Sequence, residues 1–164
     1  MEVLEFLPAT RRVLRLLASD PAEFAVEHGV KLHEMAQNVA QGGLEFMRTF
    51  SLETPAHWFG YLVVEGGTQQ MVGVCSFKGP PVEGKVEIAY YTFPGHEGRG
   101  IATAMAKFLL ERARALQEVK FITAHTLRER NASVRILEKI GMRFVCEETE
   151  DGEPVWLWQI AAED

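Results

Sequence analysis

A glycine-rich run that joins a strand-like segment to an amphipathic helix constrains the fold of this chain more than any other feature. Gly95, Gly98 and Gly100 lie between the apolar segment 86–93 and a helical pattern that begins near Ile101. The first backbone N–H groups of a helix have no partner inside it, and the helix dipole places about half a positive charge there. A strand, a glycine turn and a helix start therefore predict a binding site for an anion such as phosphate.

Two common phosphate-binding loops do not fit this run. Gly95 and Gly100 have the spacing of the P-loop, but Ile101 stands where that loop carries its lysine. Gly98 and Gly100 match the first two glycines of the dinucleotide fingerprint, and Thr103 replaces the third. The run therefore suits a phosphate that anchors a molecule without reacting. The alternative is an ordinary strand-to-helix turn that needs glycine.

Composition limits the class of protein. A chain of 164 residues that is 47% hydrophobic predicts a single domain over residues 1–164 with a buried core. Cys75 and Cys146 lack metal-ligand spacing, so we expect no metal site and a reducing, cytoplasmic location. Acids stand near the N-terminus where a signal peptide carries bases, and the apolar runs are too short to cross a bilayer. We therefore expect no association with a membrane.

The charge distribution separates two parts of the chain. The net charge of -6 argues against binding to nucleic acid. Basic residues gather between Gly95 and Arg143, and only acidic charges follow Arg143. The middle of the chain therefore suits an anionic ligand and its end a cationic one, with solvated surface charge as the alternative reading.

Hydrophobic periodicity and turn residues predict the order of elements. Asp20 and Pro21 have the pattern of a helix cap and first helical residue, and Gly141 suits a helix end. The predicted strands cover 3–6, 58–65, 71–77, 86–93, 121–126, 144–148 and 155–160. The predicted helices cover 9–18, 20–28, 32–47, 100–116 and 131–140.

Two segments resemble the motifs of one enzyme superfamily. Residues 86–103, with Glu97-Gly98-Arg99-Gly100-Ile101-Ala102-Thr103, resemble the acetyl-CoA motif of the Gcn5-related N-acetyltransferases (GNAT). Residues 124–142 resemble that superfamily's second motif, and the pair is most similar to the ribosomal-protein-alanine acetyltransferase branch. The resemblance implies an α/β (α+β) GNAT fold. This is a mixed, mostly antiparallel sheet of about seven strands, splayed between its two middle strands and flanked by about four helices.

The resemblance also implies the residues that bind acetyl-CoA. The family's loop pattern is glutamine or arginine, two residues, glycine, one residue, then glycine or alanine. Gly100 and Ala102 match it, whereas Glu97 departs from it. Asn131 is either a cofactor contact or a helix N-cap, and Arg99 either meets a phosphate or is a surface charge. The implied cofactor-binding residues are Tyr90, Tyr91, Thr92, Glu97, Gly98, Arg99, Gly100, Ile101, Ala102, Thr103 and Asn131.

The implied reaction is direct attack of an amine on the acetyl thioester, without a covalent enzyme intermediate. Glu87 is the candidate base, with an exposed strand glutamate as the alternative. His125 is a second catalytic candidate because histidine titrates near neutral pH, with a structural histidine as the alternative. Many relatives protonate the leaving sulfur with a tyrosine at the position of Leu137, so this chain offers no obvious acid.

Weak acid–base machinery favours an acceptor of low pKa. An α-amine has a pKa of about 7.7–8.0, against about 10.4 for lysine. We therefore expect a protein N-terminus or a similar amine as acceptor of the acetyl group. The alternatives are a small-molecule amine, a longer acyl-CoA donor, or a non-catalytic acetyl-CoA-binding module. The partners expected are acetyl-CoA and the amine, in a monomer or homodimer.

Overall fold

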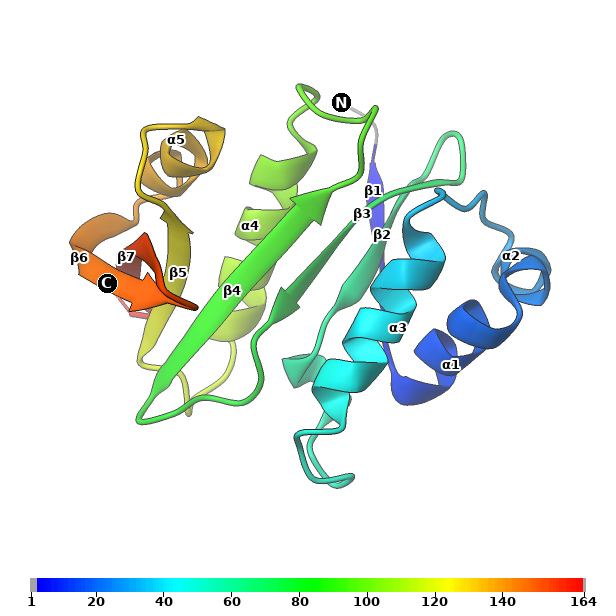
Figure 1. Cartoon of the computed structure of the whole chain (residues 1–164), viewed down its shortest axis with the longest axis horizontal. Coiled ribbons are helices and arrows are strands. Elements are labelled where there is room, and N and C mark those ends of the chain that lie inside the picture. Colours follow the sequence, from blue (N-terminus) through cyan, green and yellow to red (C-terminus); the bar gives the residue numbers. More distant parts are fainter. Residues whose placement is uncertain (1–2, 164) are drawn as a thin grey trace. The chain divides into compact units, whose positions relative to one another are not determined.

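The computed structural model describes residues 3–163, which form seven strands and five α-helices (Figure 1). The strands follow the order β1-β2-β3-β4-β5-β7-β6 in a mixed, open sheet. The strands are β1 (Leu4–Pro8), β2 (Tyr61–Glu65), β3 (Gln70–Phe77), β4 (Lys85–Thr92), β5 (Phe121–Leu127), β6 (Arg143–Glu150) and β7 (Glu153–Ala161). The helices are α1 (Arg11–Ser19), α2 (Pro21–His28), α3 (Ala36–Met47), α4 (Ile101–Arg114) and α5 (Ala132–Lys139). The expected GNAT-type mixed sheet is confirmed, with five helices rather than about four.

The chain divides into two compact units. The first unit contains residues 3–76 and 90–101, and the second contains residues 77–89 and 102–163. The expectation of one domain over residues 1–164 stays a prediction. No helix within residues 3–163 has the length and apolar character needed to cross a membrane.

The first unit packs three helices on an antiparallel ladder. β2 pairs with β1 on one side and with β3 on the other. Helices α1, α2 and α3 share one hydrophobic core with these strands. Its buried members include Leu14, Leu17, Phe24, Ala40, Leu62, Met71 and Phe93.

Local sequence accounts for the ends of α2. Asp20 Oδ1 accepts a hydrogen bond from the Glu23 N–H at 3.1 Å, and Pro21 is the first helical residue. Gly29 ends the helix with a φ of 62°, a left-handed conformation that glycine adopts without steric penalty. The predicted start and stop of this helix are both confirmed.

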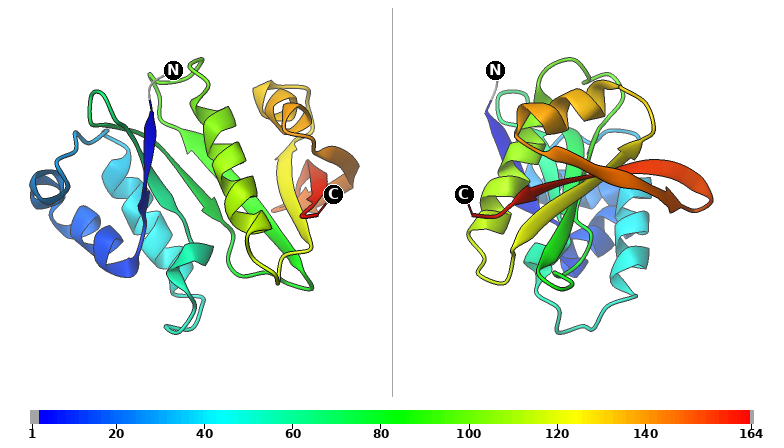
Figure 2. Two further views of the ribbon diagram at one scale, coloured as in Figure 1. Left: turned by 180° about the vertical axis from the view of Figure 1, so that it is seen from behind. Right: turned by 90° about the vertical axis from the view of Figure 1, so that its left-hand side faces the viewer.

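The second unit is built around β5. β5 pairs with β7 antiparallel, and β6 and β7 form a hairpin across Asp151 and Gly152. These two turn residues have φ angles of 52° and 81°, as a tight hairpin turn requires. α4 covers the far face of β4 and β5 in Figure 1 and lies in front of them in the reverse view of Figure 2.

β4 and β5, the two middle strands, pair in parallel over a short distance. Their register runs from Lys85 opposite Phe121 to Glu87 opposite Thr123. Both strands continue beyond this last pair, to Thr92 and Leu127 respectively. The pairing of the middle strands therefore ends at Glu87, and the splay expected between them stays a prediction.

Two predicted starts lie 4 and 3 residues before the observed ones. The third helix begins at Ala36 rather than Leu32, because the His33 side chain accepts a hydrogen bond from the Met35 N–H and fixes a turn there. The second strand begins at Tyr61 rather than Trp58, since Ala56–Trp58 forms a 3-10 turn after Pro55. In both places a local turn replaces the first residues of the expected element.

Candidate active site

The glycine run of the first unit is an open turn between β4 and α4. Gly95, Gly98 and Gly100 have φ angles of 95°, 75° and 78°, which favour glycine. A Cβ atom added at Gly95 or Gly98 would meet no heavy atom within 4 Å. Space therefore lies beside the backbone of this turn, where an anion can approach.

Glu97 directs its carboxylate back onto the turn. Its Oε1 accepts hydrogen bonds from the N–H groups of Gly95 at 2.6 Å and His96 at 3.1 Å. Hydrogen bonds from its own N–H and from those of Gly95 and His96 hold the pKa of Glu97 below its ordinary value. The residue that departs from the family pattern is therefore an anion bound by the loop's own backbone.

Arg99 forms an ion pair with Glu65, the last residue of β2. The Glu65 side chain is only 5% exposed, and its other oxygen accepts a hydrogen bond from Thr68 Oγ1 at 2.9 Å. Arg99 also donates to His96 Nδ1 at 2.9 Å. The guanidinium thus joins the turn to β2, while its side chain remains 41% exposed.

His33 supports the start of the same turn. Its Nε2 donates to the Pro94 carbonyl at 2.9 Å, and its ring stacks on Phe93 at a centroid distance of 4.9 Å. Because Nδ1 accepts from Met35, the ring is the neutral Nε2–H tautomer. A residue 61 positions away therefore fixes the backbone that leads into the glycine turn.

The last residues of β4 combine buried and exposed polar groups. Burial raises the pKa of the Tyr90 hydroxyl to about 12, so it stays protonated at neutral pH. Tyr91 is 43% exposed and meets Phe93 edge-on. Thr92 Oγ1 is buried without a hydrogen-bond partner in the described part of the chain. Such an atom normally has a partner, so it is available to a polar group of a bound molecule.

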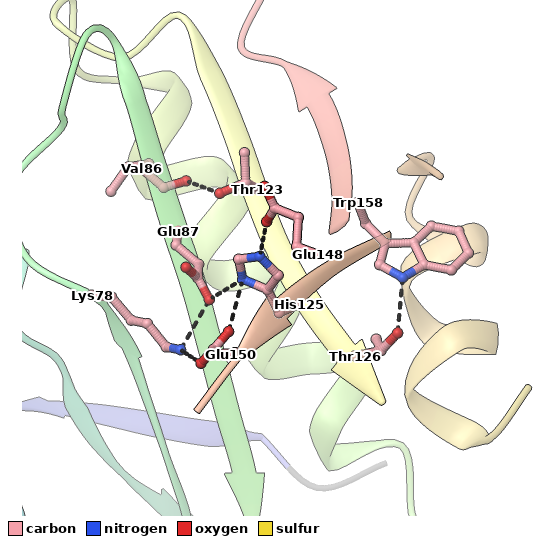
Figure 3. A network of polar contacts seen from close by, with 9 residues as sticks. All are labelled: Lys78, Val86, Glu87, Thr123, His125, Thr126, Glu148, Glu150 and Trp158. Carbon is pink, nitrogen blue, oxygen red and sulfur yellow. Dashed lines mark hydrogen bonds and ion pairs between the residues drawn. The ribbon is translucent and has the colours of Figure 1, made fainter. Parts of the chain in front are cut away.

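Glu87 and His125, the two catalytic candidates, are in direct contact in the second unit (Figure 3). His125 Nδ1 lies 3.0 Å from Glu87 Oε2, and Lys78 Nζ lies 3.0 Å from the same oxygen. On its other side, His125 Nε2 lies 2.7 Å from Glu148 Oε1. Glu150 Oε2 is 3.6 Å from Nδ1 and completes the set. We call these five residues the His125 cluster.

Opposing effects act on the His125 imidazole. Partial burial lowers its pKa, but hydrogen bonds to Glu148 and Glu87, with the charges of Glu87 and Glu150, raise it above its ordinary value of 6.5. The carboxylates outweigh the burial because hydrogen bonds to both ring nitrogens favour the protonated ring. These contacts therefore favour the protonated form of the His125 ring.

The remaining predicted residues lie at the starts of α4 and α5. Ile101 is buried, and Ala102 and Thr103 follow it in the first turn of α4. Asn131 is the N-cap of α5: its Oδ1 accepts from the Val134 N–H at 3.2 Å, which is the helix-cap alternative. Leu137 is 1% exposed and belongs to the core.

The residues present fit acetyl-CoA. The glycine turn leaves open space beside its backbone, and Thr92 keeps a buried hydroxyl free. A polar chain such as the pantetheine arm carries groups that can hydrogen bond to such a strand. Residues 3–163 contain no group of three or more metal-ligating side chains arranged to hold a metal ion.

Comparison with known proteins decides the family. The family model for the acetyltransferase (GNAT) domain matches residues 10–143. The chain belongs to the GNAT family. It is an acetyl-CoA-dependent N-acetyltransferase. No curated protein matched the chain.

Solved GNAT structures share the fold at low sequence identity. A spermidine N-acetyltransferase chimera of SpeG from Vibrio cholerae and hSSAT is 15% identical, with a TM-score of 0.67 over 97% of this chain and 95% of that one. RimL, a ribosomal L7/L12 alpha-N-protein acetyltransferase in complex with coenzyme A, is 16% identical, with a TM-score of 0.64 over 96% and 93%. Ribosomal-protein-S5-alanine acetyltransferase from Vibrio fischeri is 13% identical, with a TM-score of 0.64 over 98% and 93%.

The sequence did not indicate which residues contact the two catalytic candidates, Glu87 and His125. Lys78, Glu148 and Glu150 contact the candidate pair from elsewhere in the chain. The one available signal was alternation: Glu148 and Glu150 are two residues apart on one strand and so share a face. Nothing in the sequence indicated that the side chains of Glu148 and Glu150 would lie beside His125.

Proposed function

We propose that the acceptor of this N-acetyltransferase is a primary amine of low pKa, such as a protein N-terminus, and that Glu87 takes its proton. The observation that supports the proposal is the contact of Glu87 Oε2 with Lys78 and His125, each at 3.0 Å. Both contacts fall on one oxygen. Oε1 has no partner among the described residues, so it is available to an ammonium group or to a water molecule.

Each group of this chain has a separate task in the proposed reaction. Acetyl-CoA supplies the acetyl thioester that the amine attacks. The backbone N–H groups of residues 98–102 bind its pyrophosphate, and a strand N–H near Tyr91 or Thr92 stabilises the charge that develops on the carbonyl oxygen. Glu87 deprotonates the acceptor, directly or through one water molecule. Leu137, at the position where many relatives carry a tyrosine acid, is buried in the core and cannot protonate the leaving thiolate.

The pKa of the acceptor decides between amines. Deprotonating a lysine side chain at neutral pH requires roughly 3 kcal/mol more than deprotonating an α-amine, since their pKa values differ by about 2.5 units. The proposed base, Glu87, is a carboxylate that already contacts Lys78 and His125. This arrangement favours the more acidic amine.

A small polycationic amine is the second candidate. The outer strand β6 carries Glu147, Glu148 and Glu150, all of them exposed, and bears a single basic residue. A spermidine acetyltransferase chimera is also among the proteins that share this fold. An acidic strand beside the reacting amine would attract a second positive charge on the same molecule.

The test measures thiol release from acetyl-CoA with matched acceptors. Peptides with a free α-amine, the same peptides with a blocked α-amine and one lysine, and spermidine are compared by kcat/KM at pH 7.5. We expect the free α-amine to be the best acceptor. A higher kcat/KM for the lysine peptide contradicts the proposal, and a higher value for spermidine favours the second candidate.

The role of Glu87 is tested in the same assay. Glu87→Gln keeps the shape of the side chain but removes the base, so we expect kcat to fall by roughly 10²- to 10⁴-fold. The KM for acetyl-CoA should stay within about twofold of the wild-type value. Lys85→Gln, on the same strand, is the matched control and should keep normal activity. An unchanged kcat in Glu87→Gln would exclude Glu87 as the base.

A further inference from the structure

Both nitrogens of the His125 ring face carboxylate oxygens. Nδ1 lies 3.0 Å from Glu87 Oε2, and Nε2 lies 2.7 Å from Glu148 Oε1. A neutral imidazole carries one N–H donor and one lone pair, so it can satisfy only one of these carboxylates. In this geometry the ring donates both hydrogen bonds as an imidazolium, and it is not available to accept a proton.

The charged groups around His125 come from β4, from the segment before β4 and from β6. β4 contributes Glu87, and Lys78 lies in the segment that leads to β4. β6 contributes Glu148 and Glu150. β7 places the uncharged Leu157 opposite His125 in the ladder. The cluster therefore combines three carboxylates with one lysine and the imidazolium, and Figure 3 shows His125 between Glu87 and Glu148.

We propose that His125 is a positioning residue rather than a base, and that Glu148 keeps it charged so that it holds Glu87 in the orientation needed for acetyl transfer. The proposal rests on the function assigned to Glu87 above. The Nδ1–H of the imidazolium fixes Oε2, and Lys78 fixes the same oxygen from another direction. Oε1 is thereby left to face the acceptor.

The consequence is a defined loss of activity at high pH. When the ring loses a proton, one nitrogen presents a lone pair to a carboxylate, and one of the two hydrogen bonds is replaced by repulsion. The hold on Glu87 then weakens. Activity should therefore fall as pH rises through the pKa of His125, which lies above the ordinary histidine value.

Glu148 and its neighbour Glu147 provide a matched pair of variants. Both are on β6, and their side chains are 45% and 47% exposed. Glu147 pairs with Arg128 at 3.4 Å and makes no contact with His125 in the described structure. Glu148→Gln removes the carboxylate at Nε2 and keeps the side-chain length, whereas Glu147→Gln removes an equivalent charge on the other face of the strand.

The experiment measures two pH dependences on the full protein. One is kcat/KM for acetyl transfer, and the other is the NMR titration of the His125 ring. In Glu148→Gln we expect both midpoints to move to lower pH by roughly one unit, which is about a tenfold loss of activity on the alkaline side. Glu150→Gln should move them less, because its distance to Nδ1 is 3.6 Å. Glu147→Gln should leave both midpoints in place.

The outcomes separate this proposal from the assignment of Glu87. If the His125 titration moves in Glu148→Gln while the alkaline limb of kcat/KM stays in place, His125 charge does not support the reaction and the proposal is wrong. Unmoved midpoints in both measurements also overturn it. Normal activity in Glu87→Gln would instead remove the proposed base, and the NMR titration would still report on the contact between Glu148 and His125.

Discussion

Glu97 is the residue of the glycine turn whose charge opposes an anionic ligand. Its carboxylate accepts from the N–H groups of Gly95 and His96, and these bonds hold its pKa low, so it is charged at neutral pH. Nearby, Arg99 is paired with Glu65. The backbone N–H groups and the guanidinium that could bind a phosphate at this turn therefore already contact carboxylates of the chain itself.

We predict that Glu97→Gln tightens the binding of acetyl-CoA, because it removes a negative charge beside the proposed phosphate site. The gain should be roughly twofold to fivefold at low ionic strength and should shrink as salt screens the exposed charge. Titration calorimetry at two salt concentrations measures it, with Glu111→Gln on α4 as the control. Weaker binding in Glu97→Gln would mean that its hydrogen bonds to the turn matter more than its charge.

Contacts between distant residues were beyond sequence reasoning. Glu87 and His125 were identified separately, from their positions in two predicted strands, and the structure joins them at 3.0 Å. Glu65 with Arg99, and His33 with Pro94, span 34 and 61 residues. Local patterns carry no information about such pairs, because strand register and helix packing decide them.

At the scale of elements, caps and turns could be read from sequence because their causes are local. Asp20 with Pro21 starts α2, Gly29 ends it, and the Asp151–Gly152 pair closes the last hairpin, as predicted. The start of β2 was missed since Trp58 has the apolar character of a strand residue. The chain there forms a 3-10 turn, and the ladder with β1 begins only at Tyr61.

Two neighbouring glycines in the middle of α3 provide a prediction at this scale. A Cβ at the exposed Gly42 would meet no atom within 4 Å, whereas a Cβ at Gly43 would lie 2.9 Å from Leu14 Cδ1 of α1. Gly42→Ala should raise the free energy of unfolding by about 0.5–1 kcal/mol, since alanine favours helix more than glycine. Gly43→Ala should gain less, because the buried Leu14 must move.

Urea unfolding followed by circular dichroism compares the two variants. The difference between them isolates the packing of α1 on α3, since both substitutions remove the same backbone freedom from the unfolded chain. Equal gains in Gly42→Ala and Gly43→Ala would mean that Leu14 adopts another rotamer without penalty. A loss in Gly42→Ala would contradict the exposed helical position of that residue.

At the scale of the whole molecule, ligand binding is coupled to stability. A molecule that binds only the folded state raises the free energy of unfolding by about 2.7 kcal/mol at 100 times its dissociation constant. For a chain of this size each kcal/mol corresponds to about 2–4 °C in Tm. Coenzyme A at about 100 times its dissociation constant should therefore raise Tm by about 5–10 °C. This rise reports binding without requiring knowledge of the acceptor.

Gly98 and Gly152 make that measurement specific to the glycine turn. Their φ angles are 75° and 81°, and a Cβ at either position would meet no atom within 4 Å. Alanine at either position therefore carries the same backbone penalty, about 1–2 kcal/mol, and should lower Tm to a similar extent without ligand.

With coenzyme A, Gly152→Ala should keep the full rise in Tm. Gly98→Ala should lose it, because its Cβ fills the space beside the N–H groups proposed to bind the pyrophosphate. An equal rise in both variants would mean that coenzyme A does not approach the backbone at Gly98, and the assignment of the turn would then be wrong.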